Sequence, residues 1–201
     1  MSPIAAELVQ KLRATSGAGL MDCKRALEKT EGNMEKALQV LRENGIAKGS
    51  ARADKTAAEG IIYSYIHPGS KVGVLLELNC ETDFVARTED FISLAKELSL
   101  QVAGANPQWV KRDDVPAEIV DREKEIARHQ SENSKKPPQV VEKILSGRLE
   151  EFFETNCLLD QTHLRDASGK TKIKSLIEQT SGKLNEKVEV RRFTRYRVGG
   201  N

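Results

Sequence analysis

Apolar residues in the first forty-five positions recur at helical spacing in three successive groups. A turn at 16–19 separates the first two groups, and a break at 31–33 leaves Asn33 placed to cap a third helix. Gly45 then occupies the position of a glycine that ends a helix. The apolar positions are Ile4, Leu8, Val9 and Leu12, then Leu20, Cys23 and Leu27, then Met34, Ala37, Leu38 and Leu41. The pattern predicts a three-helix bundle over 1–45, whose small core needs support from a partner or from the rest of the chain.

Residues 46–60 are polar and rich in alanine, which predicts a linker with room for some helix. From 61 onward the pattern is that of strands, because β-branched and aromatic residues fill 61–66 and a second run alternates from 72 to 78. The sequence His67-Pro68-Gly69-Ser70 between them is typical of a turn. We expect an antiparallel hairpin with one well-buried face. Val72, Val74, Leu76 and Leu78 form that face, and Gly73, Leu75, Glu77 and Asn79 form the other.

The rest of the chain predicts helices and one closing strand. A long helix follows the corner at 79–87, with an apolar stripe of Phe91, Leu94, Ala95, Leu98 and Val102, and it ends at 106–109. Residues 116–155 predict two helices separated by a proline turn at 134–138. A polar loop near 166–169, a short helix around Ile173, Leu176 and Ile177, and a strand at 188–198 complete the chain.

The expected fold class is α+β. An amino-terminal three-helix bundle precedes an antiparallel-sheet core over 61–115 and 156–201 with covering helices, and a coiled-coil-like helical hairpin is inserted at 116–155.

Composition narrows the class of protein. With 38% hydrophobic and 31% charged residues, the chain of 201 residues is too apolar for disorder, and no run approaches the ~20 apolar residues of a membrane span. A net charge of only +2 argues against a dedicated nucleic-acid binder. Three cysteines without a CxxC pair favour a reducing compartment. Because the start at Met1–Ile4 lacks the pattern of a secretion or transit segment, we expect a cytoplasm-like location, or an organelle if such a segment was removed.

The sequence offers little for catalysis. The histidines at 67, 129 and 163 are scattered, and none stands at metal-ligand spacing with another ligand type. Phosphate-binding glycine loops are absent from the sequence, and Cys80 ends an apolar strand, where a small packing residue is expected. We therefore predict no enzyme activity, no metal and no cofactor. Four arginines interleave with aromatics in the last strand and suit either an RNA-binding face or a solvated edge: Arg191, Arg192, Arg195 and Arg197.

The segment Thr82-Asp83-Phe84-Val85 stands at a strand-to-helix corner. One interpretation is local structure, in which Thr82 or Asp83 caps the following helix and Phe84 begins the apolar stripe of Phe91. The other is an exposed wedge, because a protruding phenylalanine can bury ~1.5–3 kcal/mol in the groove of a partner. A neighbouring carboxylate can also compete at an anionic or metal-bound site. The segment by itself leaves both interpretations open.

Two long motifs stand out: Leu-Arg-Ala-Thr-Ser-Gly-Ala-Gly-Leu-Met-Asp-Cys-Lys-Arg-Ala-Leu at 12–27 and Leu-Asn-Cys-Glu-Thr-Asp-Phe-Val-Ala-Arg at 78–87. Both resemble the elongation factor Ts family, the nucleotide exchange factors of elongation factor Tu. Shorter likenesses at 65–67, 72–75, 147–149 and 191–193 extend the resemblance over essentially the whole chain.

The resemblance implies a mechanism without chemistry of its own. The bundle looks like a ubiquitin-associated-type module that docks on the GTPase domain of elongation factor Tu, with contacts at Leu12, Arg13, Leu20 and Met21. Asp83 and Phe84 match the pair of family residues that intrudes beside the Mg²⁺ site of the GDP-bound partner, and Thr82 and Val85 frame that pair. His67 matches a contact histidine on the hairpin turn. Longer relatives carry two copies of the core and this chain carries one, so we expect a homodimer in which one protomer supplies Asp83 and Phe84 and the other supplies His67.

Two other classes of function stay open at this stage. In one, the bundle over 1–45 is an adaptor that binds a peptide and the remaining chain is a scaffold. In the other, the terminal arginines serve an RNA- or ribosome-associated factor. Acceleration of GDP release from elongation factor Tu would distinguish the exchange factor from both.

Overall fold

The computed structural model describes residues 4–132 and 138–200. The chain forms two compact units. The first comprises Met1–Ile61, Leu78–Leu94 and Ser175–Glu189, and the second comprises Ile62–Glu77, Ala95–Lys174 and Val190–Asn201. The expected α+β class is confirmed, with three amino-terminal helices, a three-stranded antiparallel sheet and several covering helices.

The amino-terminal helices form the expected bundle. They are α1 (Ala6–Ser16), α2 (Leu20–Lys29) and α3 (Met34–Ser50). Leu12, Cys23 and Leu27 are fully buried in its core, because they lie on the faces that the apolar spacing predicted. Asn33 caps α3 as expected, since its side chain accepts a hydrogen bond from the backbone N–H of Lys36 at 3.0 Å.

The predicted end of the third helix at Gly45 is wrong. Helix α3 continues to Ser50, so the first five residues of the predicted 46–60 linker are helical. Gly45 and Gly49 face α8 (Ile173–Leu184), where a Cβ built on Gly49 would lie 2.1 Å from the carbonyl oxygen of Glu178. A Cβ on Gly182 of α8 would likewise lie 2.2 Å from the carbonyl oxygen of Gly45. These glycines permit a close helix crossing, and the chain needs no helix end there.

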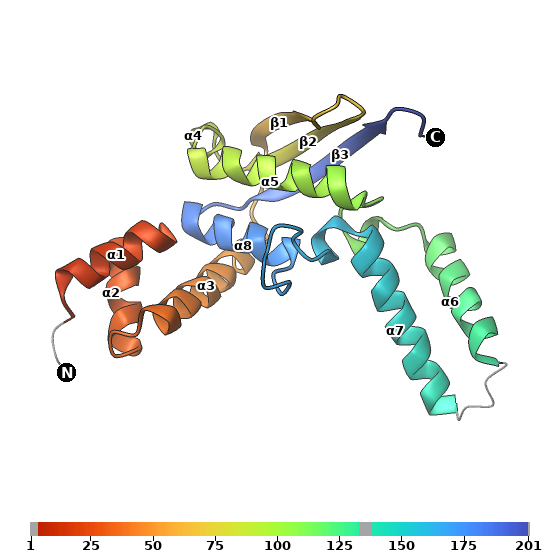
Figure 1. The fold of residues 1–201 in the computed structure, drawn as a ribbon, viewed down its shortest axis with the longest axis horizontal. Coiled ribbons are helices and arrows are strands. Elements are labelled where there is room, and N and C mark those ends of the chain that lie inside the picture. The colour runs from red at the N-terminus through yellow and green to blue at the C-terminus, as the bar shows by residue number, and fades with distance from the viewer. Residues whose placement is uncertain (1–3, 133–137, 201) are drawn as a thin grey trace. The chain divides into compact units, whose positions relative to one another are not determined.

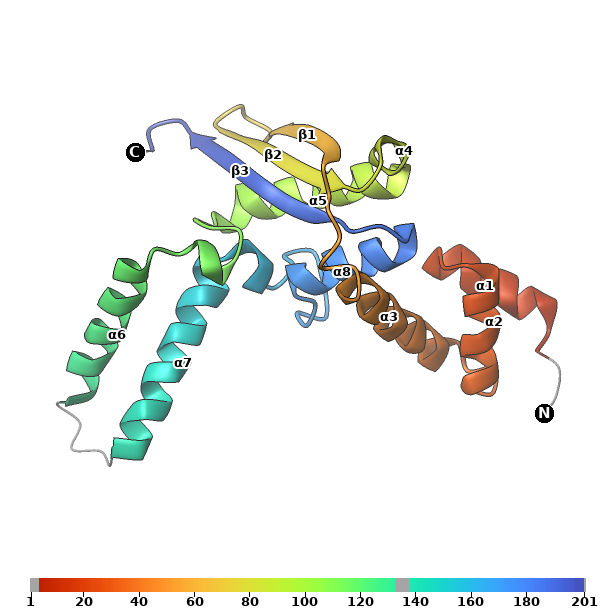
Figure 2. The same ribbon diagram turned by 180° about the vertical axis from the view of Figure 1, so that it is seen from behind.

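Strands β1 (Glu59–Ile66), β2 (Val72–Cys80) and β3 (Glu189–Arg197) pair in the order β1-β2-β3. Burial alternates along β2 as predicted, with Val74, Leu76 and Leu78 buried on one face. Helix α5 (Glu89–Ala105) carries the predicted apolar stripe, and all five of its members are buried. In the second unit, the 95–105 part of α5 lies along one face of the sheet, and none of the described helices covers the opposite face (Figures 1 and 2).

Helices α6 (Ala117–Glu132) and α7 (Pro138–Asn156) lie side by side as the expected hairpin (Figure 1). The proline turn predicted at 134–138 lies, except for its last residue, outside the described residues. At the base of the hairpin, the short helices η1 (Arg112–Asp114) and η2 (Leu158–Asp160) bring Arg112 between two carboxylates. Its guanidinium donates to Glu150 at 2.7 and 2.8 Å and to Asp160 at 2.8 Å. Within the described ranges, no helix combines the length and apolar character that crossing a membrane requires.

Candidate functional site

The corner after β2 begins with a capped helical turn. Strand β2 ends at Cys80, and α4 (Asp83–Ala86) follows after Thr82. Thr82 is extended, and its hydroxyl accepts a hydrogen bond from the backbone N–H of Val85 at 3.4 Å. This contact is the N-cap that the local interpretation of the segment predicted. It sets the direction in which the next two side chains leave the corner.

Phe84 does not join the core. Its side chain is 80% exposed, whereas Phe91 of α5 is fully buried, so the interpretation of Phe84 as the first residue of the apolar stripe is wrong. The physical reason is a break in the helix: α4 ends at Ala86, and α5 begins only at Glu89. The helical period that relates Phe91 to the rest of its stripe therefore does not reach back to Phe84.

Asp83 and Val85 complete the corner. The carboxylate of Asp83 is about half exposed and pairs with the guanidinium of Arg87 at 2.8 Å, one turn further on. Arg87 is itself exposed, and an ion pair of this kind contributes only ~0–1 kcal/mol. Asp83 can consequently exchange this partner for another cation at little cost. Val85 is half-buried.

Two residues that were not predicted from the sequence, Glu186 and Arg52, bind the corner through their side chains. Glu186 follows α8 and accepts hydrogen bonds from Glu81 and Thr82, although it lies 104 residues after Thr82 in the chain. Arg52 pairs with the carboxylate of Glu81 at 3.1 Å. The sequence held no signal for these contacts, because single charged residues in loops are ordinary on a protein surface.

The thiol of Cys80 is buried beside the corner. It donates to the carbonyl oxygen of Thr82 at 3.1 Å, and burial raises its pKa to about 11. A thiol that stays protonated is a poor nucleophile, which agrees with the packing role expected from the sequence. All three cysteines of the chain are free and buried.

The amino-terminal module presents part of its expected contact set. Leu20 and Met21 begin α2 and are 48% and 62% exposed, and Arg13 on α1 is also exposed. Leu12 differs, because its side chain is fully buried in the bundle core. Three of the four residues thus offer their side chains to solvent, and Leu12 does not.

His67 occupies the turn between β1 and β2, as its neighbours Pro68 and Gly69 predicted. Its ring is exposed, and Nδ1 lies 2.9 Å from the hydroxyl of Tyr65, with the two ring centroids 6.0 Å apart. The turn is tight, since Gly69 and Ser70 have φ of 90° and 54°. His67 belongs to the second unit and the wedge residues to the first.

The arginines of β3 are partly engaged within the protein. Arg192 pairs with Glu77 at 2.7 Å, and Arg195 donates to the carbonyl oxygen of Ala103 at 3.2 Å. In the part of the chain that the structure describes, no group of three or more His, Cys, Asp or Glu side chains is placed to hold a metal ion.

Comparison with known proteins identifies the family. The model of the family described as elongation factor TS matches residues 4–200. Elongation factor Ts of Moorella thermoacetica is 52% identical over 196 residues, which cover 98% of this chain and 96% of that protein. The corresponding protein of Fervidobacterium nodosum is 47% identical over 196 residues, covering 98% of each chain. That of Desulforamulus reducens is 49% identical over 199 residues, covering 99% and 91%. The chain belongs to the elongation factor Ts family, the nucleotide exchange factors of translation elongation, and it is not an enzyme.

Proposed function

We propose that the chain binds elongation factor Tu·GDP and accelerates GDP release by inserting the corner 82–85 beside the Mg²⁺ and phosphate site. The observation that carries this proposal is the exposure of Phe84, which at 80% is the highest among the large apolar side chains of the described residues. Burying such a side chain in a partner is favourable, because it removes apolar surface from water. Asp83 adds a carboxylate whose present ion pair is weak.

Thermodynamic linkage explains how binding becomes exchange. If the wedge and the nucleotide disfavour each other on the partner, each weakens the other by the same factor. Burial of Phe84 in the partner supplies ~1.5–3 kcal/mol, and every ~1.4 kcal/mol removed from the release barrier raises the rate about tenfold. The wedge alone can therefore account for roughly 10- to 100-fold of the acceleration.

The amino-terminal module over 1–45 is the proposed docking element for the GTPase domain. Arg13, Leu20 and Met21 supply an exposed cation next to two exposed apolar side chains, a composition that suits a protein interface. Leu12 is buried in the core of the same bundle. The remaining division into a core over 61–115 and 156–201 and a hairpin over 116–155 is part of the same proposal. We place this activity in the cytoplasm, where translation supplies the partner.

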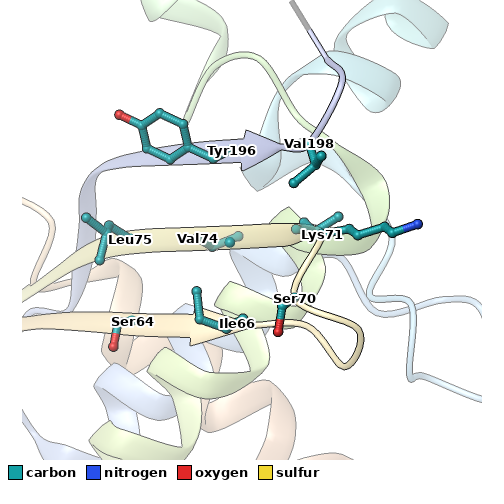
Figure 3. A pocket seen from close by; sticks show the side chains of 10 residues that line it. Ser64, Ile66, Ser70, Lys71, Val74, Leu75, Tyr196 and Val198 are labelled. Atoms are coloured by element: carbon teal, nitrogen blue, oxygen red, sulfur yellow. The ribbon is translucent and has the colours of Figure 1, made fainter.

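We further propose that two chains pair through the open face of the sheet. That face is apolar and exposed, with Ile62 and Ile66 on β1, Leu75 on β2, Tyr196 on β3, and Val198 directly after β3. Figure 3 shows Leu75 on the central strand, with Ile66 and Tyr196 on the two neighbouring strands. Since the chain carries a single core, the wedge of one protomer would act together with His67 of its partner.

The release of fluorescent GDP from elongation factor Tu tests the wedge. We expect Phe84→Ala and Asp83→Ala to slow release, Phe84→Ala by roughly 10- to 100-fold, with thermal midpoints close to wild type because both residues are exposed. Leu164→Ala, which truncates another exposed apolar residue, is the control and should exchange normally. A wild-type rate for Phe84→Ala would refute the wedge.

Mixed dimers test the pairing. Phe84→Ala and His67→Ala chains are each defective alone, but a mixed pair contains one site with an intact wedge and an intact histidine. With random exchange of protomers in a two-fold pair, equal mixing should restore roughly a quarter of the wild-type sites. Light scattering of the wild type should give twice the chain mass of 22.3 kDa. A monomer that exchanges at full rate, or mixing without recovery, would refute the shared site.

A further inference from the structure

The carboxylate of Glu186 accepts hydrogen bonds from the backbone at the start of the wedge. One oxygen accepts hydrogen bonds from the backbone N–H groups of Glu81 and Thr82, each at 3.0 Å. The other accepts from the hydroxyl of Thr82 at 2.6 Å. Three donors converge on one half-buried carboxylate, which is the arrangement of a strong, charge-assisted anchor.

In a second set of contacts, the corner supplies the carboxylate and the loop after α8 supplies a backbone donor. The carboxylate of Glu81 accepts from the backbone N–H of Lys187 at 2.6 Å and from the guanidinium of Arg52 at 3.1 Å. The N–H of Lys187 first, and then Arg52, lower the pKa of Glu81. Arg52 also donates to the side-chain oxygen of Asn185 at 2.7 Å. We call these five residues, Arg52, Glu81, Asn185, Glu186 and Lys187, the corner clasp.

The loop that carries Glu186 is itself fixed. Asn185 has φ of 58°, a left-handed conformation that asparagine tolerates, and it reverses the chain where α8 ends. The hydroxyl of Ser181, which is buried on α8, donates to the backbone carbonyl oxygen of Glu186. The backbone at Glu186 is therefore anchored to α8 as well as to the corner.

Glu186 also determines which way the cap of α4 points. A hydroxyl has one hydrogen to donate, and the hydroxyl of Thr82 is within 2.6 Å of Glu186. When that hydrogen is donated to the carboxylate, the oxygen lone pairs are left for the N–H of Val85, which lies 3.4 Å away. The bond to Glu186 thus sets the orientation in which Thr82 caps the turn.

Helix α4 cannot maintain this geometry alone. It has four residues, a single turn, and an isolated turn is unstable because nucleation fixes several residues for one hydrogen bond. The direction of Phe84 consequently depends on the attachments at the start of the turn. Those attachments are the Thr82 cap and the clasp behind it.

We infer that Glu186 is a positioning residue for the wedge: it holds Glu81 and Thr82 so that Phe84 points outward before the partner arrives. The inference rests on the proposed role of Phe84 in nucleotide exchange. Arg52, which follows the last turn of α3, joins the end of the amino-terminal bundle to the same clasp. The element proposed to dock on the partner and the element proposed to open it are thereby connected within one unit.

The test is GDP release from elongation factor Tu, measured over a range of factor concentrations. Because loss of the clasp releases a preordered turn, Glu186→Ala should lower the maximal rate on the order of tenfold. The factor concentration at half-maximal rate should change much less, because the amino-terminal contacts are untouched. Glu178→Ala is the matched control: it removes a carboxylate of α8 that binds Ser50 and not the corner, and it should keep the wild-type rate.

A double-variant cycle separates positioning from general damage. If Glu186 acts through the wedge, Glu186→Ala combined with Phe84→Ala should be no slower than Phe84→Ala alone. Thr82→Val, which removes the hydroxyl that donates to Glu186, should resemble Glu186→Ala, and the two losses should not add. Thr82→Val supplies the same comparison if Glu186→Ala does not fold.

Several results would overturn the inference. Additive losses in the double variant, or a wild-type rate for Glu186→Ala together with a slow Phe84→Ala, would remove Glu186 from the mechanism and leave the wedge in place. A wild-type rate for Phe84→Ala would instead refute the proposed wedge itself, and the positioning role would fall with it.

Discussion

Gly49 lies in the last turn of α3 against the backbone of α8, and replacing it with alanine tests how tightly the two helices cross. A Cβ there would lie 2.1 Å from the carbonyl oxygen of Glu178, 2.8 Å from its carbonyl carbon and 2.9 Å from its Cα. All three are backbone atoms, so the overlap cannot be relieved by a side-chain rotation. One helix must move.

Two opposing effects set the sign of this substitution. Replacing glycine with alanine inside a helix gains about 0.5–1 kcal/mol of stability, because alanine loses less backbone freedom on folding. Overpacking of a close contact costs about 1–3 kcal/mol. At Gly49 the overlap dominates, so we expect Gly49→Ala to destabilise the protein by roughly 1–2 kcal/mol and to lower Tm by about 2–8 °C.

Gly147 in α7 is the matched control, because a Cβ there would meet no atom within 4 Å. Gly147→Ala should therefore stabilise the protein by roughly 0.5–1 kcal/mol. Urea unfolding followed by circular dichroism at equal protein concentration gives both free energies. If Gly49→Ala raised stability as Gly147→Ala does, the close crossing of α3 and α8 would be refuted.

Two further predictions concern titratable groups. The side-chain hydroxyls and backbone N–H groups of Thr171 and Ser168 hold the pKa of Asp166 well below its usual value of 3.8. Its stabilising effect is present above pH 3.8 and lost as the pH falls through the lowered pKa, so Asp166→Asn should flatten the acid dependence of Tm below pH 4, and an unchanged profile would count against this. Burial raises the pKa of Cys80 and Cys157 to about 11, so iodoacetamide at pH 8 should label them only after unfolding, whereas rapid labelling of the native protein would contradict their burial.

Much of the fold could be predicted from periodicity. The buried stripe from Phe91 to Val102 and the alternation along β2 lie where the sequence placed them, because burial of apolar side chains imposes the period of the element on the sequence. Asn33 capped α3 for a similarly local reason, since a cap is satisfied by a backbone N–H only a few residues away. The family motifs at 12–27 and 78–87 were also visible in sequence, and they carry the surfaces that we propose bind the partner.

Helix ends and exposure at the corner depended on distant contacts. Gly45 has the sequence context of a helix terminus, yet α3 passes through it because α8 packs there, far along the chain. In the sequence, Phe84 fits the helical period of Phe91. In the structure, the helix is broken before Glu89, and the side chain of Phe84 points to solvent. Leu12 matches both a contact position of the family and an apolar position of the bundle, and the structure places its side chain in the bundle core.

The sequence by itself determined the family, the succession of elements and the wedge motif, because each depends on a contiguous motif or on the spacing of residues close together in the chain. The tertiary structure decided what holds the wedge outward. Glu186 and Arg52 reach the corner from other parts of the chain, and neither is distinguished by its neighbours in sequence. A single helical turn such as α4 has too few internal bonds to fix its own direction, so the long-range contacts of the clasp decide it.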